Sequence, residues 1–193
     1  MKPTPNEMLK RYAKDKEHAK SVNRLALMIF DETSKKIYEM PQIEKNYLES
    51  AALLHDIGYF IEAKNHNKHS MQMVIQEGLK GFDDRETKII GCICRYHRGS
   101  LPNKEEHEVY KTLEKNDRKI VKRLGGILKL SDGLCKDHLY SFKDIKIEYD
   151  NKNSIAKFIL IPQSIPPDIR TAIRKRDLFE VGFKCQSVLL MGE

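Results

Sequence analysis

The stretch from Ala51 to Ile61 constrains the fold of this chain more than any other part of the sequence. It begins with the small and apolar residues of a buried helix and ends in His55-Asp56-Ile57-Gly58. A histidine and an aspartate at the buried end of a helix are costly unless they are paired or bind a metal ion. The stretch therefore predicts a polar centre inside a helical protein, completed by side chains from neighbouring helices.

Three more predicted helices each place one metal-competent side chain in phase with their apolar residues: His18, His97 and Asp132. These helices are expected near residues 17–30, 83–97 and 116–135, the first two marked by apolar positions three and four residues apart. A core histidine that is hydrogen-bonded to a neighbour would explain His18 by itself. One such group on each helix favours a shared site instead.

The remaining pattern predicts a mostly α fold with a small C-terminal α+β part. Further helices are expected over residues 43–55 and from Lys68 or His69 to residue 79, and a capping box of Asp83 and Glu86 should open the helix that carries His97. Alternating residues at 145–149 and 154–161 predict a β-hairpin, followed by a short helix at 166–176 and a strand at 184–191. We therefore expect a helical bundle over residues 1–140 and an α+β appendage over 141–193 that packs on it. The pair Gly125-Gly126 in a predicted helix indicates close approach of another helix.

Composition narrows the function less than the motifs do. The chain has 193 residues and a formal net charge of +7, which suits phosphate compounds, nucleic acid or membrane surfaces, although a lysine-rich solvated surface also explains it. Its four cysteines form no CxxC pair, no signal-peptide core is visible, and no apolar run is long enough to cross a bilayer. We expect a cytoplasmic protein without membrane association.

The polar residues can be divided into two metal subsites. His18, His55, Asp56 and Asp132 would hold one ion, and His69 and His97 a second, with Asp56 between them. Mixed imidazole and carboxylate ligands suit Mn, Fe, Ni, Co or Zn. Two such ions could activate water and neutralise a phosphoryl group, which makes Asp56 and His97 the candidate catalytic residues. The cations expected to bind substrate phosphate are Lys68, Arg98 and Lys136.

Two families share these motifs. The order of His18, His55-Asp56 and Asp132 resembles the ligand pattern of HD-domain metal-dependent phosphohydrolases. Four segments resemble the C-terminal HD region of the exopolyphosphatase/guanosine pentaphosphate phosphohydrolase (Ppx/GppA) family, over nearly the whole chain: Leu53-Leu54-His55-Asp56-Ile57-Gly58, Lys68-His69-Ser70, Arg95-Tyr96-His97-Arg98 and Asp177-Leu178-Phe179-Glu180. The resemblance implies an HD-domain helical bundle and a phosphohydrolase activity.

The sequence departs from that family in two places. The actin-like N-terminal domain that holds the family's exopolyphosphatase site is not in this sequence, so that activity is not expected of it. The family often has a carboxylate at the position of Cys135, three residues after Asp132.

The expected function is therefore metal-dependent hydrolysis of a phosphoester or phosphoanhydride in a nucleotide-like compound or polyphosphate. The alternative is a non-catalytic module that binds polyphosphate or a nucleotide, or that works with a separate actin-like exopolyphosphatase domain. The complete ligand set favours the enzyme. Nucleic acid is not expected as a partner because no aromatic stacking motif accompanies the charge. A homodimer is left open.

Overall fold

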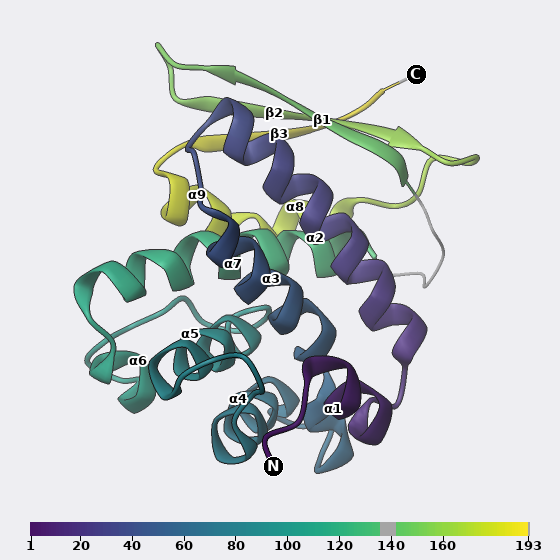
Figure 1. The fold of residues 1–193 in the computed structure, drawn as a ribbon. Coiled ribbons are helices and arrows are strands. Elements are labelled where there is room, and N and C mark those ends of the chain that lie inside the picture. Colours follow the sequence, from purple (N-terminus) through teal and green to yellow (C-terminus); the bar gives the residue numbers. More distant parts are fainter. Residues whose placement is uncertain (136–141, 193) are drawn as a thin grey trace.

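Figure 1 shows the computed structural model of the chain, which describes residues 1–135 and 142–192. The N-terminal helices are α1 (Pro5–Tyr12), α2 (Lys16–Lys36), α3 (Gln42–Leu54), the 3-10 helix η1 (Ile57–Phe60), α4 (His66–Glu77), α5 (Asp84–Arg95), α6 (Glu108–Thr112) and α7 (Lys115–Leu134). The C-terminal part contains β1 (Phe142–Asp150), β2 (Ile155–Pro162), α8 (Arg170–Lys175), α9 (Asp177–Phe183) and β3 (Gln186–Met191). The predicted mostly helical fold with a small α+β appendage is confirmed.

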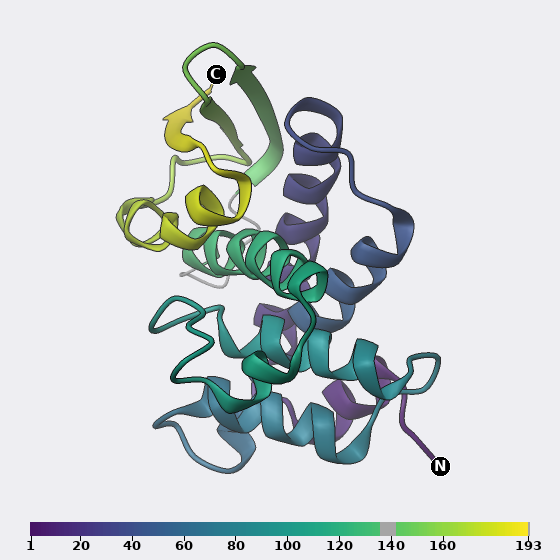
Figure 2. The ribbon, with the colours of Figure 1, turned by 90° about the vertical axis from the view of Figure 1, so that its left-hand side faces the viewer.

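Helix α7 forms the centre of the molecule. It contacts α2, α3 and α5 on one side and α8 and α9 on the other. Figures 1 and 2 show it between the helical layer of α4 to α6 and the layer that contains α8, α9 and the sheet. Its buried residues include Val121, Leu124, Ile127 and Leu128, which recur at helical spacing. Side chains on different faces of α7 therefore contact the two layers.

The start of two helices is fixed by local hydrogen bonds. The expected capping box is present in α5, because Asp83 accepts from the Glu86 amide at 2.8 Å and Glu86 accepts from the Asp83 amide at 2.9 Å. Helix α4 begins at His66, two or three residues before the predicted start, after Asn65 in a left-handed conformation. The Asn65 carbonyl accepts the amides of Lys68 and His69. The earlier start places His66 on the buried side of α4, next to the polar centre.

The sheet has three strands in the order β1-β2-β3. The predicted hairpin is confirmed, with β1 antiparallel to β2 and Ile145 opposite Leu160. The predicted last strand is also confirmed and lies parallel to β2, so α8 and α9 form the crossover between them. The buried face of the sheet packs on α2 and α9, as shown by a hydrogen bond from Arg24 to the Phe142 carbonyl at 3.0 Å.

No helix within residues 1–135 or 142–192 combines the length and the apolar character that a membrane crossing requires.

Helix α9 lies directly against the backbone of α7, as the glycine pair predicted. A Cβ atom on Gly126 would lie 2.6 Å from the backbone nitrogen and Cα of Phe179, which is closer than real Cβ contacts. A Cβ on Gly125 would meet only side-chain atoms, at 3.2 Å from Leu178 and 3.6 Å from Tyr96. Of this pair, Gly126 is therefore the one that the packing of the two helices requires, and Gly182 of α9 is required in the same way, because its Cβ would lie 2.7 Å from the Lys122 carbonyl oxygen.

We expect Gly126→Ala to lower the free energy of unfolding by about 1–3 kcal/mol, because backbone atoms of α9 would have to move. Gly125→Ala is the matched control: its methyl group meets a flexible side chain, and alanine favours the helix by about 1 kcal/mol. Urea unfolding followed by circular dichroism measures both variants. Equal stabilities of the two variants would contradict the close approach.

Candidate metal centre

The turn that carries His55 and Asp56 is clamped from helix α4. Ser70 Oγ accepts a hydrogen bond from the Gly58 amide at 2.8 Å and donates one to the His55 carbonyl at 2.6 Å. A Cβ on Gly58 would lie 1.9 Å from the His66 carbonyl oxygen, so no larger residue fits there. The serine and the glycine together fix the backbone of this turn against the start of α4.

Three histidines around Asp56 share one orientation, set by their own helices. In each of them the ring Nδ1 donates a hydrogen bond to the carbonyl three residues earlier. The pairs are His55 to Ala52 (2.8 Å), His66 to Ala63 (3.0 Å) and His97 to Cys94 (2.7 Å). Because Nδ1 carries the proton in each, Nε2 is the atom left to face the centre and to bind a metal ion.

One group of donor atoms consists of His66, His97 and Asp56. His66 Nε2 lies 3.3 Å from His97 Nε2 and 3.1 Å from Asp56 Oδ1. His97 Nε2 lies 3.4 Å from the same carboxylate oxygen. The three atoms form a nearly equilateral triangle, and both imidazoles are buried.

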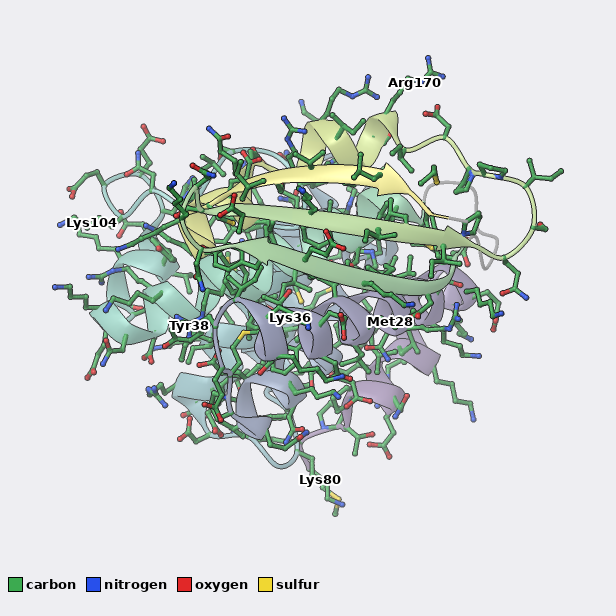
Figure 3. All side chains as sticks on the ribbon, turned by 90° about the horizontal axis from the view of Figure 1, so that it is seen from above. Met28, Lys36, Tyr38, Lys80, Lys104 and Arg170 are labelled. Atoms are coloured by element: carbon green, nitrogen blue, oxygen red, sulfur yellow. The ribbon has the colours of Figure 1, made fainter. Side chains whose placement is uncertain are left out.

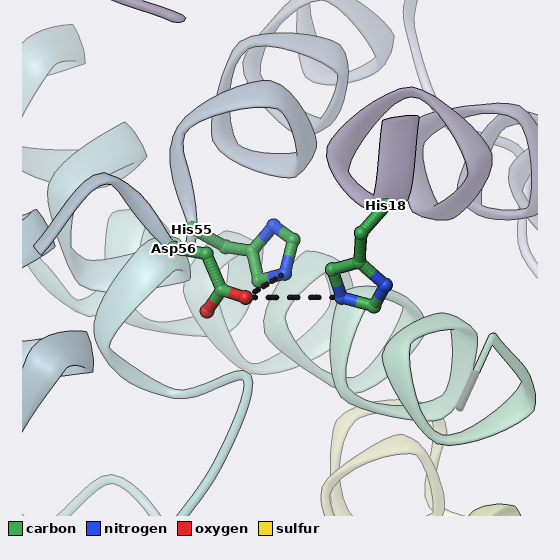
Figure 4. Close-up of side chains that lie close together, drawn as sticks. All are labelled: His18, His55 and Asp56. Carbon is green, nitrogen blue, oxygen red and sulfur yellow. Dashed lines mark ion pairs between the residues drawn. The ribbon is translucent and has the colours of Figure 1, made fainter. Parts of the chain in front are cut away.

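A second group lies on the other oxygen of Asp56. Oδ2 is 3.4 Å from His55 Nε2 and 3.7 Å from His18 Nε2, the contacts drawn in Figure 4. Asp132 closes this group, since its Oδ1 is 3.2 Å from His18 Nε2 and 3.8 Å from His55 Nε2. Asp56 therefore belongs to both groups, one through each oxygen.

The donor atoms are spaced as ligands of a common ion are spaced. Nitrogen and oxygen ligands about 2.0–2.2 Å from one ion lie roughly 2.8–3.6 Å apart in octahedral or tetrahedral coordination. The contacts above run from 3.1 to 3.8 Å, so small side-chain shifts would bring the longest of them into this range. His55 Nε2 and Asp56 Oδ1 are buried and make no well-formed hydrogen bond within the described part of the chain. Facing lone pairs need a proton or a cation between them, so the residues fit a metal ion.

The pKa values of the two carboxyl groups keep them charged. Burial alone would raise the pKa of Asp56, but the positive charge of the neighbouring His55 imidazole lowers it well below the usual range. Burial likewise opposes the charge of Asp132, yet the His18 hydrogen bond and the Lys175 charge hold its pKa far down. Both groups are thus ready to bind a cation at neutral pH.

The pKa values of two of the imidazoles are shifted in opposite directions. Burial would lower the pKa of His55, but the Asp56 carboxylate outweighs it and raises that pKa to about 9. Burial and the nearby His55 charge lower the pKa of His97 to about 3. Without metal, the cluster therefore keeps a proton on His55, while His97 is neutral.

A pocket of about 670 Å³ opens onto these residues. Its polar lining includes three cations, Lys14, Arg98 and Lys175, and one wall is Tyr59, which stacks on His66 with a centroid distance of 3.9 Å. Lys175, from α8, forms an ion pair with Asp132. The pocket therefore combines the metal-competent atoms with positive charge, which suits an anionic ligand.

Several residues named from the sequence come together here. The structure places His18, His55, Asp56, His97 and Asp132 in one cluster, and Arg98 at the pocket. His69 was wrongly assigned: it is partly exposed, and its Nε2 lies 3.8 Å from Glu62 outside the cluster. Lys68 is exposed and is not among the described residues that line the pocket. Lys136 lies outside the described residues.

His66 is the histidine that the sequence analysis missed. Because α4 begins at His66, this residue shares the buried face with Ser70, Met73 and Val74, whereas His69 does not. Helical spacing counted from residue 66 would have identified it. Lys175 was also missed, because its helix lies 43 residues after Asp132 in the chain and only the crossover brings it back.

Cys135 takes no visible part in the cluster. Its thiol is buried, and burial raises its pKa to about 11, so it stays protonated. It is not among the described residues that line the pocket. The carboxylate expected at this position from the family pattern is therefore not replaced by a thiolate ligand.

Comparison with known proteins places this fold in a family. The model of the family described as Ppx/GppA phosphatase, domain III, matches residues 2–164. Among similar proteins, the guanosine-5'-triphosphate,3'-diphosphate pyrophosphatase of Aeromonas salmonicida (strain A449) is 29% identical over 136 residues, 68% of this chain and 26% of the relative. The enzyme of the same name from Pseudoalteromonas translucida (strain TAC 125) is 30% identical over 105 residues, 52% of this chain and 20% of the relative.

The similarity concerns one part of these relatives, because the chain spans about a quarter of their length. The family match itself covers most of the chain, from the first helix to the end of the hairpin. The chain therefore belongs to the Ppx/GppA phosphatase domain III family.

Proposed function

We propose that this protein is a metal-dependent phosphohydrolase of the HD type. Its substrate would be a phosphoester or phosphoanhydride in a nucleotide-like compound or in polyphosphate. The observation that carries the proposal is the convergence of four imidazole Nε2 atoms and two carboxylates within bonding range of common ions. The cations Lys14, Arg98 and Lys175 in the pocket lining, together with the charge that a bound metal ion would add beside Asp56 and Asp132, support an anionic substrate.

These residues would bind one or two divalent transition-metal ions, such as Mn, Fe, Ni, Co or Zn. His18, His55, Asp56 and Asp132 would hold the first ion; His66 and His97, with Asp56 shared, would hold the second. Such ions would supply Lewis acidity to the phosphoryl group and lower the pKa of water. His97, with a pKa of about 3, is a neutral imidazole at neutral pH, with its one proton on Nδ1 and none on Nε2, so its role is that of a ligand and not of a general acid.

The substrate phosphate would be held by cations at the edge of the cluster. Arg98 lies beside His66, with a guanidinium nitrogen 3.4 Å from His66 Nδ1, and Lys175 lies beside Asp132 in the other ligand group. A planar guanidinium can bind two phosphate oxygens at once, which would orient the phosphoryl group toward Asp56. Lys14 adds charge at the pocket entrance.

The relatives support the reaction class. The family is described as a phosphatase family, and the similar Aeromonas protein is a pyrophosphatase acting on guanosine-5'-triphosphate,3'-diphosphate. The alternative is a binding module without hydrolysis that acts beside an actin-like domain. Turnover by the purified chain separates the two: binding of phosphate compounds without hydrolysis under all metal conditions would favour the module.

The two histidines of α4 provide a matched pair of variants. We expect His66→Ala to lose about half of the bound metal and most of the turnover, because it removes a ligand of the second group. His69→Ala should leave both unchanged, since His69 contacts Glu62 instead. Metal content by plasma emission spectrometry, and hydrolysis of p-nitrophenyl phosphate, pyrophosphate and GTP with Mn, Ni, Co or Zn, test this.

Asp56→Asn should remove both ions, because each carboxylate oxygen belongs to one ligand group. The reverse pattern, with His69→Ala losing metal and His66→Ala keeping it, would show that α4 is placed incorrectly. Full metal content in Asp56→Asn and His55→Ala would remove the metal site from this cluster.

Metal binding should release protons, because an ion must displace the proton that His55 carries below about pH 9. We therefore expect the affinity for the first Zn ion to rise with pH up to about 9, with about one proton released per protein molecule at pH 7. Calorimetry in two buffers with different ionisation enthalpies measures this number. A pH-independent affinity between pH 6 and 9 would contradict the raised pKa of His55.

Arg98→Ala should raise KM by roughly tenfold with the metal content intact, since a hydrogen bond to a charged group contributes about 1.5 kcal/mol. Lys68→Ala is the control, because Lys68 is exposed and lies outside the described pocket lining. Steady-state kinetics on the preferred substrate of the panel separate the two. A larger effect from Lys68 than from Arg98 would reverse the assignment.

A further inference from the structure

A second cavity, of about 1070 Å³, lies at the other end of helix α7. It is bordered by the first half of α7, the loop around residues 100–106, the turn after α2 and the end of α9. Lys122 is ten residues before Asp132, so about 15 Å of helix separates this cavity from the metal centre. Figure 3 shows Tyr38 and Lys104, two of its lining residues, on the same side of the molecule.

The cavity is strongly basic. Lys115, Lys119 and Lys122 recur at helical spacing along α7 and cover about 10 Å of its length. None of them forms an ion pair within the part of the chain that the structure describes, and the same is true of Lys184 on α9's C-terminal side. Among the described lining residues, Glu106 is the sole carboxylate. The excess of positive charge in the lining therefore favours binding of an anion.

A buried arginine is built into its wall. Arg123 is 8% exposed, and its guanidinium donates to both oxygens of Glu44, at 2.9 and 3.0 Å. The same guanidinium lies 4.5 Å from the centre of the Tyr38 ring. Its Nε has no hydrogen-bond partner among the described residues, although it is buried. The Glu44 carboxylate and the Tyr38 ring therefore hold this guanidinium in place at the cavity wall.

Aromatic side chains line the same cavity. Tyr38, Tyr149 and Phe183 belong to it, and Tyr38 is 51% exposed although Arg123 packs on its ring. Exposed aromatic rings beside lysines are the combination that binds a base by stacking and phosphates by charge. Lys184 follows in a left-handed conformation (φ 54°), which a lysine adopts only at a cost.

We propose that this cavity is a second site, which binds a nucleoside polyphosphate independently of the metal centre. The base stacks at the Tyr38 end, and the phosphates lie along Lys119 and Lys122 of α7. A mononucleotide suits a cavity of this size. A ligand with a base and several phosphates would contact both the aromatic rings and the row of lysines. The inference does not depend on the proposed hydrolysis, because no residue of the metal cluster lines this cavity.

Calorimetry with GTP and with tripolyphosphate, in EDTA so that no metal is bound, tests the site. We expect GTP to bind the wild-type chain at least fivefold more tightly than tripolyphosphate, from base stacking. The double charge reversal Lys119→Glu/Lys122→Glu should weaken both ligands by about tenfold or more. Lys10→Glu/Lys80→Glu is the matched control, because it makes the same charge change on exposed lysines outside the cavity; Lys80 is labelled in Figure 3.

Tyr38→Ala should abolish the difference between GTP and tripolyphosphate, whereas Tyr38→Phe should keep it. This pair decides the question even if the charge reversal unfolds the protein, which circular dichroism would show. Asp56→Asn should leave GTP binding in EDTA unchanged.

Four results would overturn the proposal. The first is no GTP binding up to millimolar concentration, and the second is equal binding of GTP and tripolyphosphate. The third is loss of binding in Asp56→Asn while the charge-reversal variant still binds. The fourth is displacement of GTP by a uridine decanucleotide at much lower concentration. The second indicates a phosphate-chain site, the third the metal centre, and the last a nucleic-acid groove.

Discussion

The convergence of imidazole nitrogens on one carboxylate is the constraint on which the rest of this structure depends. Asp56 has histidine Nε2 atoms against both of its oxygens, and backbone carbonyls fix three of those rings through Nδ1. The lone pairs of these nitrogen and oxygen atoms repel one another, so the side chains must be held in place for the cluster to form. The backbone holds them in place: His55 and His97 bond to the last turns of α3 and α5, His66 bonds to the Ala63 carbonyl just before α4, and Ser70 fixes the turn after α3.

The same constraint explains why the packing around α7 is so close. Asp132 must reach His18 from one side of this helix while α8 and α9 cover the other side. Gly126 allows the backbone of α9 to lie directly on α7, and Gly133 does the same for Ala172 of α8. This contact brings Lys175 to Asp132. The glycines therefore have an electrostatic consequence, because they determine how close a positive charge comes to a buried carboxylate.

Much of this could be predicted from the sequence, and the errors have identifiable causes. Helical spacing placed His18, His97 and Asp132 on buried faces, and the His55-Asp56 pair was recognised by its position after an apolar helix. The choice of His69 over His66 failed because the start of α4 depends on the left-handed Asn65, which spacing alone does not reveal. Lys175 could not be assigned, because its position depends on a crossover between two parallel strands. The cavity at the start of α7 joins segments from four parts of the chain, so local patterns give no signal for it.

The parallel pairing of β2 and β3 also has a consequence for the order of folding. Antiparallel β1 and β2 can form as soon as both have been synthesised, but β3 can pair with the far edge of β2 only after α8 and α9, which pack on α7, have been made. Contacts between distant segments form slowly because the intervening loop must close first. On a ribosome, the histidine cluster would thus assemble from the first 135 residues, while the lysine opposite Asp132 would arrive afterwards. A newly made chain could meet a metal ion before that lysine competes for the carboxylate.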